Sequence, residues 1–167
     1  MPVTINWVDE LKKSESSCIR IPLSIGILAV YQSDNVLTRT EWCIQNAESL
    51  SLFDDRKCIQ IQQYLNNPTH PLKVDLQKKG TGFRNQVWAE ICRIPVGQVL
   101  SYSDLAIIVG SGARAVANAC RDNPFPGIIP CHRVVAVTGL GGYMGETSGK
   151  FMEIKKKLLN MESQLIV

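Results

Sequence analysis

The chain has 167 residues, of which 45% are hydrophobic and 20% are charged, a composition typical of a folded protein with one sizeable core or two small ones. Its longest apolar run near the amino terminus, Ile25–Tyr31, is too short to cross a bilayer and follows mixed polar residues, so we expect no membrane span, no signal peptide and a cytoplasmic location. The net charge of +3 arises in residues 80–167, which carry nine Lys/Arg and six Asp/Glu. This mild excess fits a polyanionic partner, and it fits an ordinary solvated surface equally well.

The six cysteines are scattered, and no two form a CxxC pair. In a chain without an export signal, free buried thiols are expected rather than disulfides. Only two histidines, His70 and His132, are available as imidazole ligands, so no metal or other cofactor is expected; a metal in the amino-terminal domain stays an open question.

The first half of the chain predicts a small α/β domain over residues 1–78. Residues 19–32 and 35–42 are rich in β-branched and aromatic side chains and flank a hairpin turn at residues 33–35. Residues 54–67 have helical periodicity, with Cys58, Ile61, Tyr64 and Leu65 on one face, and Pro68 ends the helix. The Pro- and Gly-rich residues 66–82 are interpreted as the linker between two domains.

The second half, residues 79–167, predicts a mainly helical domain. Helices are expected over residues 83–94, 101–110, 113–122 and 151–164, and Ser101 with Asp104 forms a capping pattern. The two short helices around Gly110–Gly112 have the outline of a helix-turn-helix, although a plain αα-hairpin fits the pattern as well. In a helix-turn-helix, residues 113–122 would meet DNA, and their small side chains favour binding that is indifferent to sequence.

The stretch PCHRVV places Cys131 beside His132. A cysteine attacks as its thiolate, which requires a base or a positive environment. On an extended segment the two neighbouring side chains would point to opposite faces, so we expect a water between them rather than direct contact. The alternative is an inert core thiol beside a hydrogen-bonded histidine.

Several motifs follow one another in a characteristic order: GTGFRNQVW, IPVGQVLSYSDLA, RAV, NP, IPCHRVV, GLGGY and KKKLL. In this order, over residues 80–162, the sequence resembles the O6-alkylguanine-DNA alkyltransferases, which are methylated-DNA–protein-cysteine methyltransferases. The resemblance implies an α+β protein with a small ribonuclease H-like α/β domain, followed by a mainly helical domain with a winged-helix-like helix-turn-helix. It also implies DNA repair by a single, irreversible transfer of the alkyl group of O6-alkylguanine, and also of O4-alkylthymine, to the protein's own cysteine.

The resemblance also implies a role for individual residues. Cys131 is the acceptor, His132 the water-bridged base, Glu162 the carboxylate that orients it, and Asn123 the brace of the active-site turn. On the DNA side, Arg114 fills the place that the flipped base leaves in the stack, and Tyr102 lies against the phosphate of the flipped nucleotide. The other expected DNA-binding residues lie on the same helix as Arg114: Ala115, Asn118 and Arg121. The pocket wall is assigned to Tyr143, Met144 and Gly145, and the pocket lysine is either Lys150 or Lys155, with Lys155 favoured by its place on the last helix.

The expected partner is double-stranded DNA with an alkylated guanine in any sequence context, bound by a monomer; cooperative binding along DNA stays open. Three other interpretations are weaker. A binder of damaged DNA without repair activity would lack the acceptor cysteine, and a cysteine hydrolase would keep its histidine apart from the nucleophile. A bifunctional regulator would require a further cluster of metal-binding cysteines.

Overall fold

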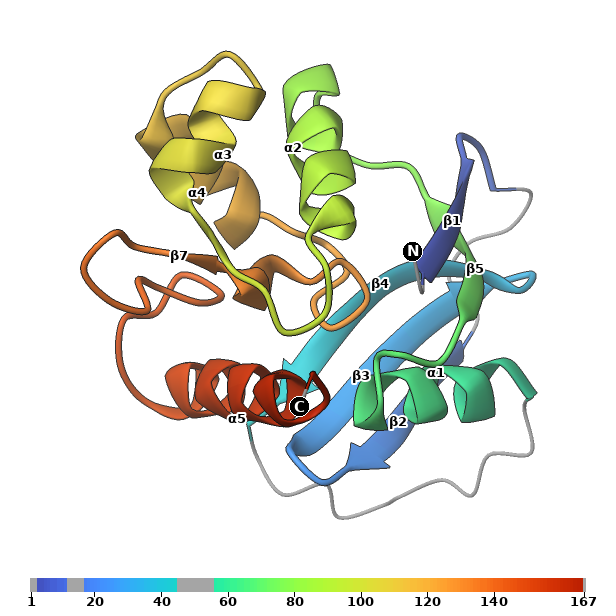
Figure 1. Cartoon of the computed structure of the whole chain (residues 1–167). Coiled ribbons are helices and arrows are strands. Elements are labelled where there is room, and N and C mark those ends of the chain that lie inside the picture. Colours follow the sequence, from blue (N-terminus) through green and yellow to red (C-terminus); the bar gives the residue numbers. More distant parts are fainter. Residues whose placement is uncertain (1–2, 12–16, 45–55, 167) are drawn as a thin grey trace. The chain divides into compact units, whose positions relative to one another are not determined.

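In the computed structural model, which describes residues 3–11, 17–44 and 56–166, the first half of the chain forms a five-stranded mixed sheet (Figure 1). The strand order is β1-β5-β4-β3-β2. Strands β2, β3 and β4 form an antiparallel meander, whereas β5 is parallel to both of its neighbours. The strands are β1 (Val3–Val8), β2 (Ser17–Leu23), β3 (Gly26–Ser33), β4 (Val36–Cys43) and β5 (Leu72–Gln77).

Two expectations for this sheet were wrong in detail. Residues 19–32 form two strands rather than one, because a turn at Ser24 and Ile25 separates β2 from β3. The expected linker, residues 66–82, contains β5, which lies between β1 and β4. Leu72, Val74 and Leu76 alternate with polar residues and are buried, so the two-residue period of a strand was present but was obscured by the flanking prolines and glycines.

The hairpin turn between β3 and β4 lies where it was predicted. Asp34 and Asn35 both have positive φ, 48° and 67°, the backbone conformation of a two-residue hairpin turn that follows the twist of its strands. Helix α1 (Arg56–Asn66) packs against β2 and β5, and it buries the predicted face formed by Cys58, Ile61, Tyr64 and Leu65. The first residues of the predicted helix, 54 and 55, lie outside the described residues.

The chain divides into two compact units. The first contains the sheet and α1 together with Pro124–Ile128, and Thr40 of β4 holds that later segment through its backbone N–H to the Pro124 carbonyl (3.0 Å) and its hydroxyl to the Pro126 carbonyl (2.8 Å). The second unit consists of Gly80–Asn123 and Ile129–Val167. The candidate site described below lies entirely within the second unit.

The second unit is mainly helical. Its helices are α2 (Gly82–Arg93), α3 (Tyr102–Ile108), α4 (Ala113–Arg121) and α5 (Lys150–Gln164), with a 3-10 helix η1 (Cys131–Arg133) and a short parallel pair of β6 (Leu100–Ser101) and β7 (Val134–Val135). Two helices begin at side-chain caps, since Thr81 accepts from the Arg84 N–H and Ser101 from the Asp104 N–H. The Ser101 cap is the one predicted from the sequence.

Helices α3 and α4 pack against each other and are joined by residues 109–112. Helix α4 buries Val116, Ala119 and Cys120. Arg114, Asn118 and Arg121 are exposed, and their spacing of four and three residues puts them on one face of the helix. The second unit therefore presents a polar helical face with two positive charges. No helix among the described residues is both long and apolar enough to cross a membrane.

Candidate active site around Cys131

Cys131 lies at the start of the 3-10 helix η1 and is only 3% exposed. The Cys131 N–H donates to the Ile129 carbonyl at 2.8 Å, and the Arg133 N–H to the Pro130 carbonyl at 2.9 Å. The extended conformation expected for this segment is therefore wrong. In a 3-10 helix successive side chains are a third of a turn apart, so Cys131 and His132 do not point to opposite faces.

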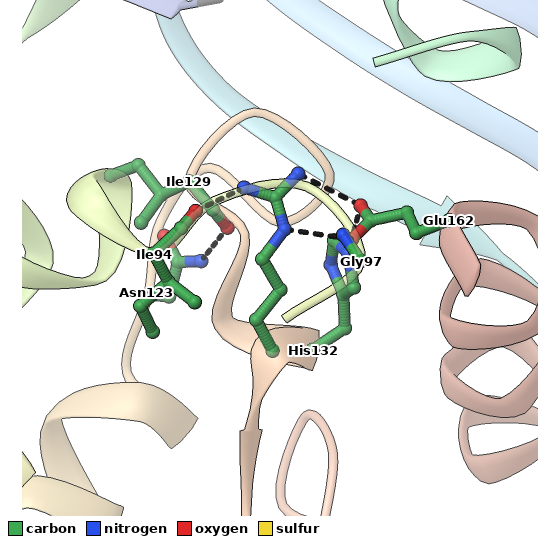
Figure 2. Close-up of polar contacts among 7 residues, drawn as sticks. Ile94, Gly97, Asn123, Ile129, His132 and Glu162 are labelled. Carbon is green, nitrogen blue, oxygen red and sulfur yellow. Dashed lines mark hydrogen bonds and ion pairs between the residues drawn. The ribbon is translucent and has the colours of Figure 1, made fainter. Parts of the chain in front are cut away.

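Asn123 braces this turn from the end of α4. Its side-chain Nδ2 donates to the Ile129 carbonyl at 3.0 Å (Figure 2) and to Sγ of Cys131 at 3.1 Å. Asn123 is 4% exposed, so both hydrogen bonds are shielded from water. One buried amide thus fixes the backbone before the cysteine and stabilises negative charge on its sulfur.

Glu162 of α5 is the centre of a buried polar cluster with His132 and Arg133. Its carboxylate accepts from Nε2 of His132, from Nε and Nη2 of Arg133, each at 2.8 Å, and from the Gly97 N–H at 3.2 Å. Nη1 of Arg133 donates to the Ile94 carbonyl at 2.8 Å. Figure 2 shows the side chains of His132 and Glu162 converging beside Gly97. The two hydrogen bonds between Arg133 and Glu162 form a bidentate ion pair, in which the buried positive charge and the buried negative charge compensate each other.

The electrostatics of this cluster favour a neutral histidine and a charged glutamate. Burial raises the pKa of Glu162, but the hydrogen bonds and charges of His132 and Arg133 outweigh it and lower that pKa to about 2. Burial, together with the positive charges of Arg133 and Lys155, lowers the pKa of His132 more than the hydrogen bond and charge of Glu162 raise it. Since a carboxylate can only accept, Nε2 of the neutral ring carries the hydrogen, which leaves Nδ1 as the basic atom. Among the described residues, this buried Nδ1 has no hydrogen-bond partner.

Burial also raises the pKa of the Cys131 thiol, while the Asn123 hydrogen bond and the positive charge of Lys155 lower it. The raising effect is the larger, so the resting side chain is a thiol and its reaction requires a proton acceptor. Nδ1 of His132, the next residue in the chain, is a candidate for this acceptor, and Glu162 holds the ring through its opposite nitrogen.

Of the two candidate lysines, the structure brings Lys155 to the site. Lys155 is fully buried, and its Nζ donates to the carbonyls of Val134, Leu140 and Gly142 at 2.7, 2.7 and 2.8 Å. Burial lowers its pKa to about 8. Lys150 is exposed at the first turn of α5. Lys155 therefore connects α5 to β7 and to the glycine-rich loop, and its charge acts on Cys131.

A pocket of about 230 Å³ lies beside Cys131. Tyr143, Met144 and Gly145, which the resemblance assigns to the pocket wall, line it, and so do three residues that it assigns to the DNA side, Tyr102, Asn118 and Arg121. The Tyr102 hydroxyl donates to the Gly142 carbonyl at 3.3 Å, and burial raises its pKa, so it stays protonated. Arg114 and Ala115 lie earlier on α4 and are not among the lining residues.

Sequence reasoning missed two contributors to the site, Arg133 and Cys120. Arg133 stands in an apolar run, and a charged residue in such a run requires a buried partner; that signal was available in the sequence. Cys120 lines the pocket with Cys131 but lies on a helix of small residues, where nothing local marks it. Burial raises the pKa of its thiol, so it remains uncharged.

The fold and the site define a mixed α+β protein that holds a buried cysteine, next to a buried histidine in the chain, at a pocket beside an exposed basic helix. Residues 82–164 match the family model described as "6-O-methylguanine DNA methyltransferase, DNA binding domain". A methylated-DNA–protein-cysteine methyltransferase of Archaeoglobus fulgidus is 37% identical over 117 residues, which are 68% of this chain and 78% of the relative. One of Metallosphaera sedula is 33% identical over 146 residues, which are 84% of this chain and 89% of the relative.

The solved structures agree with this assignment. Mycobacterium tuberculosis OGT in complex with DNA matches with a TM-score of 0.72 and 30% identity, over 88% of this chain and 93% of that one. The chain belongs to the methylated-DNA–protein-cysteine methyltransferase family, so the resemblance predicted from its motifs is confirmed.

Proposed function

We propose that this protein repairs DNA by moving the alkyl group of O6-alkylguanine, and also of O4-alkylthymine, onto Cys131, once per molecule. The observation that carries the proposal is the hydrogen bond from Asn123 to Cys131 at the pocket. His132, the residue after Cys131, is itself hydrogen-bonded to Glu162. Family membership supports the same chemistry, because the relatives at 37% and 33% identity are named for transfer from methylated DNA to a protein cysteine.

The transfer is a displacement at carbon. The Cys131 thiol gives its proton to Nδ1 of His132, directly or through a water molecule, and the thiolate attacks the alkyl carbon. The new S–C bond forms as the O6–C bond breaks, and the electron pair of that bond stays with the guanine. The guanine takes up a proton, so that the net reaction exchanges the thiol hydrogen for the alkyl group. The protonated Tyr102 hydroxyl is suited to stabilise the departing base as a donor. Because the thioether is stable and nothing in the reaction cleaves it, each molecule acts once.

The O6 atom of a paired guanine lies inside the duplex, so the nucleotide must be flipped into the pocket. The exposed face of α4 supports this role: Arg114 would fill the vacated position in the stack, and Asn118 and Arg121 would contact the strand nearer the pocket. The small side chains of α4 favour contacts that do not distinguish sequences. Binding is proposed to involve a monomer acting in the cytoplasm.

The finer fold assignment is part of the same proposal. The mixed sheet with α1 supports a ribonuclease H-like amino-terminal domain over residues 1–78. The α3–α4 pair, preceded in the chain by β6 and followed by its partner strand β7, supports a winged-helix-like domain over residues 79–167, in which α4 is the helix that enters the groove of DNA.

Intact-protein mass spectrometry after incubation with duplex DNA containing O6-methylguanine tests the reaction directly. The wild type is expected to gain one methyl group per chain and then stop, whereas Cys131→Ser gains none. An unchanged wild-type mass contradicts the proposal. Release of product beyond one equivalent contradicts it as well, and would favour a cysteine hydrolase.

The role of Arg114 predicts a difference between two substrates. Arg114→Ala is expected to slow transfer from duplex DNA on the order of tenfold or more. Without Arg114, no side chain occupies the position that the flipped base leaves in the stack, and one positive charge near the phosphates is removed. Transfer from the free base O6-methylguanine should change far less, and single-turnover rates on both substrates are the measurement. Equal losses on the two substrates would contradict the role of Arg114 in filling the place of the flipped base.

A further inference from the structure

A carboxylate, Asp122, lies where neither its own helix nor a bound DNA would favour a negative charge. It ends α4, with its N–H donating to the Asn118 carbonyl at 3.0 Å, and the carbonyl end of a helix carries a partial negative charge. The same helix presents the basic face that is proposed to meet the phosphates of DNA, which repel a carboxylate. A negative charge at this position therefore requires positive partners.

Asp122 has two such partners, and they bind different oxygens of its carboxylate. Nη2 of Arg84, on α2, donates to Oδ2, and Nε of Arg121, on α4, donates to Oδ1 at 3.3 Å. The side chains of Arg84 and Asp122 are only 37% and 32% exposed, whereas that of Arg121 is 57% exposed. One carboxylate thus links a partly buried arginine of α2 to an exposed arginine of α4.

The α2 side of this link is held by further contacts. Trp88, four residues after Arg84 and on the same face of α2, is buried, and its indole N–H donates to the Ala119 carbonyl of α4 at 2.8 Å. The Arg84 N–H donates to the Thr81 hydroxyl at 3.3 Å, at the start of the helix. The position of the Asp122 carboxylate is therefore set by the packing of α2 against α4, and Arg121 is held by it.

Arg121 extends from this carboxylate to the pocket. It lines the pocket together with Gly145, and a Cβ atom at Gly145 would lie 3.5 Å from both Cγ and Cδ of Arg121. The aliphatic part of the side chain thus packs against the glycine-rich loop while Asp122 accepts from Nε. Among the described residues, Nη1 and Nη2 of Arg121 have no acceptor, so both can donate to a phosphate.

We propose that Asp122 and Arg84 are positioning residues, which hold Arg121 at the pocket so that it binds a phosphate of the strand that carries the flipped nucleotide. This inference rests on the proposed function, since it concerns the DNA of that reaction. A mobile arginine loses rotamer freedom when it binds, and a side chain that is already held loses less. Two arginines and one carboxylate leave one net positive charge, so the phosphate is still attracted.

The substitution Asp122→Asn separates positioning from simple charge. It keeps the size of the side chain, but the amide has a single acceptor atom and no charge, so it cannot bridge two guanidinium groups. Loss of a negative charge should tighten binding to unmodified duplex DNA, which fluorescence anisotropy measures. Loss of positioning should nevertheless slow single-turnover transfer from saturating duplex with O6-methylguanine about fivefold, the scale set by ordering one flexible side chain.

Transfer from the free base O6-methylguanine distinguishes the positioning of Arg121 from damage to the neighbouring Asn123. The free base has no phosphate, so its rate in Asp122→Asn should change far less than the duplex rate. Glu90→Gln is the matched control, because it removes the same charge from another carboxylate that is paired with an arginine, Arg93, at 2.6 Å. Both transfer rates of this control should equal those of the wild type.

Arg84 tests the same link from α2. Arg84→Met should slow duplex transfer about twofold, and Arg84→Lys, which again offers Asp122 a cation, should recover most of the wild-type rate. A wild-type rate in Arg84→Met would overturn the part assigned to Arg84. Duplex transfer at the wild-type rate in Asp122→Asn overturns the whole inference, and so do equal losses on duplex and free base. If the wild type gains no methyl group, the proposed function has failed instead, and the two failures are thereby distinguished.

Discussion

Two regions next to Cys131 differ in the interactions that hold them: one is a buried polar cluster, and the other is the wall of a pocket. On one side, the polar cluster of His132, Arg133 and Glu162 is almost completely buried, and the Glu162 carboxylate accepts four hydrogen bonds. The pocket wall includes the side chains of Cys120, Tyr143 and Met144, which contribute to the shape of the pocket. In the proposed reaction the cluster holds the proton acceptor, and the wall receives the substrate.

This difference predicts how each region responds to change. A buried ionic cluster loses much of its free energy when one partner is removed, because the remaining charge is left without compensation. A wall of apolar side chains loses only packing, so its variants should fold and differ in the substrates that they accept. The contrast therefore predicts large effects for variants of the cluster and small effects for variants of the wall.

Removal of the Glu162 carboxylate should have the largest effect. Glu162→Ala leaves the Arg133 guanidinium buried without its ion pair and the His132 ring without its acceptor, so the free energy of unfolding should fall by about 3–5 kcal/mol. Transfer to Cys131 should be nearly lost at a temperature where the variant is still folded. Denaturant unfolding and single-turnover rates are the measurements.

Glu153→Ala is the matched control for that experiment. Glu153 is an exposed glutamate in the first turn of the same helix, α5, and its removal should change stability by no more than about 0.5 kcal/mol. If the two variants lost equal stability, the contrast between cluster and surface would be wrong.

The same cluster should make stability depend on pH in acid. The pKa of Glu162 is lowered from 4.5 to about 2, so the unfolded chain binds the proton more readily; its stabilising contribution is present above pH 4.5 and is lost as the pH falls towards 2. His132, whose pKa lies below 6.5 in the folded chain, acts in the same direction from pH 6.5 downwards.

The measurement is the free energy of unfolding between pH 7 and pH 2 for the wild type and Glu162→Gln. The difference between the two proteins should shrink as the pH falls below about 4.5, since the wild-type carboxylate is then losing its advantage. A difference that stays constant down to pH 2 would show that the ion pair does not stabilise the fold in this way.

The smallest effect is expected on the pocket wall at Cys120. Cys120→Ala should still take up one methyl group per chain and lose only about 1 kcal/mol of stability, because it removes one buried sulfur and leaves no charge behind. Burial raises the pKa of the Cys120 thiol, and among the described residues no hydrogen bond like the one from Asn123 to Cys131 opposes that rise, so Cys120 is not expected to act as a second acceptor. Peptide mapping of the methylated wild type should therefore locate the methyl group on Cys131, and a substantial fraction on Cys120 would contradict this prediction.

The parts of the fold that follow local rules could be predicted from the sequence. The Ser101 cap, the buried face of α1 and the turn at Asp34 and Asn35 each involve residues a few positions apart, and each lies where the pattern predicted. β5 was missed because a strand in the middle of a sheet is specified by its neighbours β1 and β4, which are distant in the sequence. The conformation of η1 was also missed, since Pro130 and the Asn123 side chain bend a segment whose residues favour a strand.

The order of residues already specifies the chemical groups of this protein: a cysteine beside a histidine, followed by a glycine-rich loop, a lysine and a glutamate on the last helix. Which of these groups meet depends on the packing of the folded chain. It brought Lys155 rather than Lys150 to the carbonyls around the site, paired Arg133 with a glutamate 29 residues away, and put Cys120 and Met144 on the pocket that Cys131 lines. The physical reason is that a buried charge must find compensation wherever the packed chain provides it, and local sequence patterns do not specify that partner.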